Sequence, residues 1–90
     1  MVRVVITYKG QVQGVGFRFT VRSIARDFPE IAGTVENLPS GNVELVAEGP
    51  SARIDALHAA ICRQMGGYIS SFDKTVSQDL AGLNGFSIVL

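Results

Sequence analysis

The chain has very few of the residues that usually carry metal binding or covalent catalysis. Its 90 residues include one cysteine, Cys62, one histidine, His58, and no tryptophan. A single cysteine excludes an internal disulfide and a CxxC zinc site. No carboxylates or other ligands have metal-site spacing near the glycine-rich stretch described below. We therefore expect neither a metal nor a cofactor.

Long apolar runs are also missing. No stretch approaches the ~18 to 20 apolar residues that span a bilayer. The N-terminal MVRVVITYKG alternates and then turns, unlike a signal-peptide core. We expect a cytoplasmic protein with no membrane contact. Apolar residues make up 47 % of the chain, which suffices for a packed core, and so short a chain forms one domain, residues 1–90.

Acidic residues are absent from the first 26 positions. That segment carries a formal charge of +5 and the remainder carries −5, although the net charge is zero. A small anionic ligand is attracted to wherever the first segment clusters. The acidic remainder repels a long polyanion, so no nucleic acid partner is expected.

Hydrophobic periodicity predicts the order β-α-β-β-α-β. The expected strands are residues 3–9, 33–37 and 42–48, followed by a fourth strand region that is possibly split in two, into residues 68–78 and 85–90. An amphipathic helix is expected from about residue 19 to Pro29, and another from an N-cap at Ser51 to Gly66. This pattern is typical of an α+β two-layer sandwich of the ferredoxin-like kind, with an antiparallel four- to five-stranded sheet and two helices on one face.

The stretch GQVQGVGFR, residues 10–18, joins the first strand to the first helix. Its glycines allow backbone N–H groups to converge on an anion near a helix N-terminus, and Arg18 supplies a forked cation. A flexible turn with an incidental arginine fits equally well. The stretch lacks the GxxxxGK[ST] of a P-loop. It also resembles an RNA-binding motif, but that motif belongs to a third strand.

Together with GTVENLPSGNVELVAEG, residues 33–49, this stretch closely resembles the two signature blocks of the acylphosphatases. The resemblance extends over essentially the whole chain. It implies hydrolysis of the carboxyl-phosphate bond of acyl phosphates. It further implies that Arg18 and the backbone amides of Gln13, Gly14, Val15, Gly16, Phe17 and Arg18 bind the phosphoryl group. Asn37 is implied to orient the attacking water, although by itself it fits a turn-preceding asparagine.

Two residues depart from the pattern of that family. Thr34 stands where an aromatic residue is usual, and Glu36 stands where a basic residue is frequent. In a regular strand both lie on the face opposite to Val35 and Asn37. Packing or substrate preference is where a difference is expected.

The scarcity of reactive groups limits the substrate. Near the glycine stretch we find no nucleophile and no general acid, and His58 and Cys62 lie in a helix away from both blocks. An acyl phosphate suits such a site because it expels a carboxylate whose conjugate acid has a pKa near ~4. We expect a monomer that binds a small acyl phosphate and inorganic phosphate, the product and competitive ligand. The alternative is a non-catalytic anion-binding or regulatory module.

Overall fold

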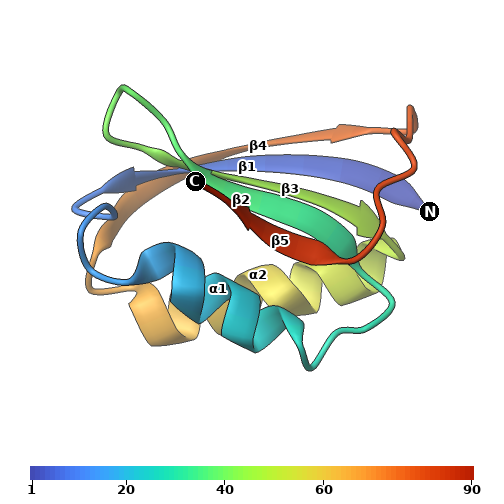
Figure 1. Cartoon of the computed structure of the whole chain (residues 1–90), viewed down its shortest axis with the longest axis horizontal. Coiled ribbons are helices and arrows are strands. Elements are labelled where there is room, and N and C mark those ends of the chain that lie inside the picture. Colours follow the sequence, from blue (N-terminus) through green and yellow to red (C-terminus); the bar gives the residue numbers. More distant parts are fainter.

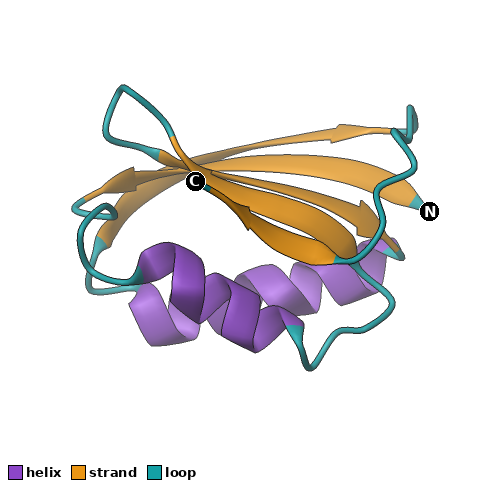
Figure 2. Cartoon of the chain, in the orientation of Figure 1, coloured by secondary structure: helices purple, strands orange, loops and turns teal.

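A computed structural model describes all 90 residues. Two helices cover one face of a five-stranded sheet (Figures 1 and 2). The elements are β1 (Val2–Gly10), α1 (Phe17–Ala25), β2 (Ala32–Asn37), β3 (Val43–Gly49), α2 (Ser51–Met65), β4 (Ile69–Ser77) and β5 (Phe86–Val89). The predicted ferredoxin-like sandwich is confirmed, and its fourth strand region is split into two strands, β4 and β5. Neither helix has the length and apolar character needed to cross a membrane.

The sheet is mixed, which corrects the expectation of a purely antiparallel one. Its order is β4-β1-β3-β2-β5, and β5 pairs in parallel with β2. The topology explains this direction. β3 is antiparallel to both β1 and β2, so those two strands run the same way. β4 is antiparallel to β1, and the chain then reverses through residues 78–85. After that reversal β5 must run in the direction of β2.

Both helices differ slightly from their predicted ends. α1 begins at Phe17, so Arg18 lies in its first turn, and it ends at Ala25 instead of reaching Pro29. The next three amides donate to carbonyls three residues earlier, which tightens the chain into a turn. α2 is preceded by Pro50 and not by an N-cap at Ser51, because the Pro50 carbonyl already accepts the first helical hydrogen bonds.

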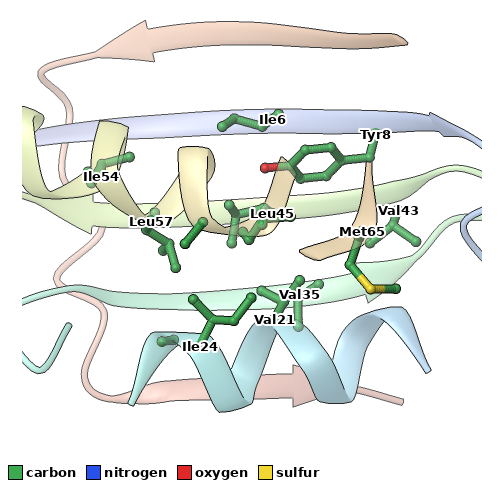
Figure 3. Packing of buried hydrophobic residues seen from close by; sticks show 14 of the residues in the cluster. Ile6, Tyr8, Val21, Ile24, Val35, Val43, Leu45, Ile54, Leu57 and Met65 are labelled. Carbon is green, nitrogen blue, oxygen red and sulfur yellow. The ribbon is translucent and has the colours of Figure 1, made fainter. Parts of the chain in front are cut away.

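The core lies between the sheet and the helices (Figure 3). Alternate residues of β1 and β3, including Ile6, Tyr8 and Leu45, are fully buried against apolar residues of α1 and α2 such as Val21 and Leu57. Burial of each large apolar side chain contributes about 1.5–3 kcal/mol. The strands and helices therefore form a rigid frame for the loops at their ends.

On the opposite face of the sheet, Glu48 anchors the connection between β4 and β5. Its carboxylate, only 4 % exposed, accepts hydrogen bonds from the backbone N–H groups of Ala81 at 2.6 Å and Leu83 at 2.9 Å, and from Arg3 at 3.0 Å. These bonds hold the pKa of Glu48 below its ordinary value. The anchored connection leads into β5, whose last residue, Val89, contacts the candidate site.

Candidate active site

The glycine-rich stretch forms a loop, residues 11–16, between β1 and α1. Gly14 and Gly16 have φ angles of 78° and 76°. This left-handed conformation is strained for other residues. A Cβ at either position would meet no atom within 4 Å, so the backbone conformation, and not crowding, requires glycine here.

Backbone N–H groups of residues 13–18 are available to a ligand. None of them donates a backbone hydrogen bond outside the regular elements. Those of Phe17 and Arg18 belong to the first turn of α1, where no preceding turn supplies an acceptor. That first turn contains no acidic residue, so the partial positive charge of the helix N-terminus is not neutralised there. The loop can therefore accept an anion without breaking existing hydrogen bonds.

Gln13 links this loop to the turn between β2 and β3. Its side-chain amide donates to the carbonyl oxygens of Leu38 at 2.8 Å and Asn42 at 2.9 Å. The family resemblance implies a role only for the backbone amide of Gln13. No sequence signal identifies its side chain as a bridge, because the partners are 25 and 29 residues away.

A small hollow of about 200 Å³ opens between the loop, α1 and the end of β2. It brings together residues of both sequence blocks: Val12, Gly14, Gly16, Phe17, Arg18, Phe19 and Asn37. Gln13 and Val15 belong to the same loop but do not line the hollow. Two segments separated by a helix in the sequence thus face one cavity.

Arg18 is the cation of this hollow. It is half-buried, and its Nη1 donates to the Val89 carbonyl at 3.1 Å. The four ion pairs of the chain use other cations: Arg3, Lys9, Arg53 and Lys74. One hydrogen bond therefore orients the Arg18 guanidinium while its charge stays uncompensated.

Asn37 is the last residue of β2 and is half-buried beside the hollow. Val35, two residues earlier, is fully buried against the helices. The two-residue period of the strand places Asn37 on the same face. Thr34 and Glu36 face the other way, paired with Val46 and Glu44 of β3, and neither lines the hollow. The departures from the family pattern therefore lie outside the candidate site.

Comparison with known proteins decides the family. The acylphosphatase family model matches residues 4–88. The chain belongs to the acylphosphatase family. The family match includes the loop, the start of α1 and Asn37, so the resemblance of the two sequence blocks is confirmed.

Relatives cover nearly the whole length of this family member. It is 39 % identical to an acylphosphatase of Methanospirillum hungatei JF-1 over 98 % of this chain and 97 % of the relative. It is 38 % identical to one of Latilactobacillus sakei over 89 % of this chain and 88 % of the relative. The crystal structure of the Bacillus subtilis acylphosphatase is also similar, with 36 % sequence identity and a TM-score of 0.87. The match covers 100 % of this chain and 100 % of that chain.

His58 lies away from the acylphosphatase hollow, on α2. Its Nδ1 forms a hydrogen bond of 2.7 Å with the buried Tyr8 hydroxyl. The His58 and Phe72 rings make an edge-on contact, with centroids 4.5 Å apart. Burial, followed by the charge of Lys74, lowers the pKa of His58. Burial also raises the pKa of the neighbouring Cys62 thiol, which leaves it protonated and a weak nucleophile.

We expect His58→Ala to affect stability and not catalysis. The substitution leaves the Tyr8 hydroxyl buried without a partner, which should lower the free energy of unfolding by about 1–3 kcal/mol. The value of kcat/KM should remain nearly unchanged because His58 does not line the hollow. Urea denaturation and steady-state kinetics measure the two effects. Cys62→Ala, one turn further along α2, serves as control and should retain activity. A large loss of activity in a stable His58→Ala variant would contradict this role.

The same histidine predicts a pH dependence of stability. Its pKa in the folded protein is below the ordinary value of 6.5, so the unfolded chain binds the proton more strongly. Its stabilising contribution is complete above about pH 6.5 and is lost as the pH falls through the lowered pKa. Urea unfolding at several pH values should show a smaller decline over this range in His58→Ala than in the wild type.

Proposed function

We propose that this acylphosphatase hydrolyses acyl phosphates in the hollow between the glycine loop and Asn37. The loop amides of residues 13–18 and the Arg18 guanidinium bind the phosphoryl group, and Asn37 orients the attacking water. The observation that carries the proposal is the convergence of Gly14, Gly16, Arg18 and Asn37 on one hollow.

Charge at the hollow suits a phosphoryl group. Its oxygens meet unpaired N–H groups, the positive end of the α1 dipole and the uncompensated Arg18. A guanidinium can donate two parallel hydrogen bonds to two phosphoryl oxygens. Because these donors are held by the frame, they stabilise the charge of the transition state without reorganising.

Little further chemistry is needed for this substrate class. The water oxygen forms a bond to phosphorus while the bond from phosphorus to the carboxylate oxygen breaks. The carboxylate leaves unaided, since its conjugate acid has a pKa near ~4. Positioning and electrostatic stabilisation account for most of the catalysis in phosphoryl transfer.

Asn37 acts as an orienting group and not as a base. A neutral carboxamide donates and accepts hydrogen bonds but takes no proton at ordinary pH. The proton of the water therefore passes to a phosphoryl oxygen, a substrate-assisted step. The products are a carboxylate and inorganic phosphate. Inorganic phosphate carries the same oxygens and should compete with substrate for the loop.

The remaining expectations stay predictions. They are a single catalytic domain over residues 1–90, a cytoplasmic location, a monomeric state and a reaction without metal or cofactor. No three side chains among histidine, cysteine, aspartate and glutamate converge as a metal site in the structure. The alternative of a non-catalytic module loses support from the presence of both Arg18 and Asn37 and from relatives named as acylphosphatases over almost their full length.

The test is hydrolysis of benzoyl phosphate with and without EDTA. We expect the protein to accelerate the reaction well above the rate in buffer, equally in both conditions, with competitive inhibition by inorganic phosphate. A rate equal to that in buffer would support the non-catalytic module. Loss of activity in EDTA, restored by a divalent cation, would refute the metal-free reaction.

A further inference from the structure

A second, larger hollow lies at the C-terminal end of α1. Its volume is about 460 Å³, within the usual range of small-molecule sites. Residues from the last turn of α1, the following segment and the start of β5 line it, among them Arg22, Arg26, Phe28, Ile31 and Phe86. This hollow is separate from the candidate active site because the two share no lining residue.

Two arginines without ion pairs border this hollow. Arg22 and Arg26 are four residues apart and therefore share one face of the chain. Neither takes part in any of the four ion pairs of the chain. The nearby Arg53, which packs over Phe28, is paired with Glu30. The positive charge at this hollow is therefore that of Arg22 and Arg26.

Arg22 also has an unmet donor. Its Nε is buried and has no hydrogen-bond partner, while its guanidinium lies 5.6 Å from the centre of the Phe19 ring. An unpaired buried donor is unfavourable. Rotation of the guanidinium into the hollow would let Nε and one Nη donate side by side to two oxygens of a ligand. A ligand with two such oxygens would give the Arg22 Nε a hydrogen-bond partner and so remove the free-energy cost of the unpaired donor.

The other half of the lining is apolar. Ala25, Phe28, Ile31 and Phe86 supply hydrocarbon surface next to the arginines. The backbone N–H groups of Arg26, Phe28 and Ile31 already donate to backbone carbonyls. The C-terminal end of α1 carries partial negative charge, which opposes a phosphate dianion more than a monoanion. These features favour a ligand that has a planar, singly charged group attached to an apolar body.

We propose that this hollow binds a small organic carboxylate. The carboxylate is held by Arg22 and Arg26, and an aromatic or aliphatic body rests against Phe28 and Phe86. Carboxylates are also the organic product of acyl phosphate hydrolysis, so such a site would respond to the product class of the enzyme. Its existence does not depend on the catalytic roles of Arg18 and Asn37.

The experiment is a titration of the ¹⁵N-labelled full chain with benzoate, followed by NMR in saturating inorganic phosphate. Phosphate occupies the glycine loop, so benzoate should then shift the Arg22 and Arg26 Nε signals and the amides of Gly85 and Phe86. Arg22→Gln should raise the dissociation constant of benzoate about tenfold or more, since it removes a charged, forked donor. Acetate, which lacks the apolar body, should bind about tenfold more weakly or worse.

Matched variants keep the result decisive. Arg63→Gln removes an exposed arginine near the end of α2 and should leave benzoate binding unchanged. Arg26→Gln tests the second contact if Arg22→Gln unfolds, which the dispersion of the amide signals reveals. Benzoate shifts confined to residues 13–18, equal affinity for acetate and benzoate, or equal effects of Arg22→Gln and Arg63→Gln would each overturn the proposal.

Discussion

Replacement of Arg18 with alanine is expected to lower kcat/KM for benzoyl phosphate by about 100-fold or more, which corresponds to about 3 kcal/mol of transition-state stabilisation. Arg18 is the only cation that lines the candidate active-site hollow, and no carboxylate neutralises it. Its loss leaves only the loop amides and the α1 dipole to hold the phosphoryl oxygens. Affinity for inorganic phosphate should fall as well.

Steady-state kinetics and phosphate titration measure this effect. Arg63→Ala is the matched control, because it removes an exposed arginine from α2, and it should behave like the wild type. Thermal unfolding separates catalysis from folding, since Arg18 also donates to the Val89 carbonyl. Arg18→Lys should recover only part of the activity, because an ammonium keeps the charge but not the fork. Unchanged kcat/KM in Arg18→Ala would remove Arg18 from the site.

Asn37→Ala is expected to lower kcat by about 100-fold, the scale of a misplaced reacting group, while phosphate affinity stays close to that of the wild type. The position of Asn37 explains why kcat should change while phosphate affinity does not. Asn37 lines the hollow from the end of β2, whereas the amides that we propose to bind phosphate belong to a different segment, the loop before α1. Removal of its carboxamide frees the attacking water but leaves the phosphoryl contacts in place.

Pre-steady-state and steady-state rates, together with phosphate titration, test this division of roles. Asn84→Ala, in the exposed connection before β5, is the control and should have no effect on either quantity. A large loss of phosphate affinity with kcat intact would show that Asn37 binds phosphate and does not orient water.

Most of the fold could be predicted because its signals are local. The run of β-branched and aromatic residues predicts β1, and the alternation of apolar residues predicts β3. The spacing of Val21, Ile24 and Ala25 predicts α1. Helix ends were less accurate, since the turn after Ala25 uses hydrogen bonds that the apolar spacing through Phe28 does not reveal. The parallel direction of β5 also escaped prediction, because strand pairing depends on where the preceding connection crosses the sheet.

In the candidate site, too, local features could be predicted from the sequence and long-range contacts could not. By itself, the sequence determined the alternating core, the glycines that permit a left-handed loop, and the two blocks that carry Arg18 and Asn37. Only the tertiary structure decided that Gln13 bridges to Leu38 and Asn42, that Val89 orients Arg18, and that Arg22 and Phe86 share a second hollow. Periodicity records which face a residue takes within its own element. Contacts across 25 to 71 residues of chain depend on how the packed elements are placed, and that placement is decided by the core as a whole.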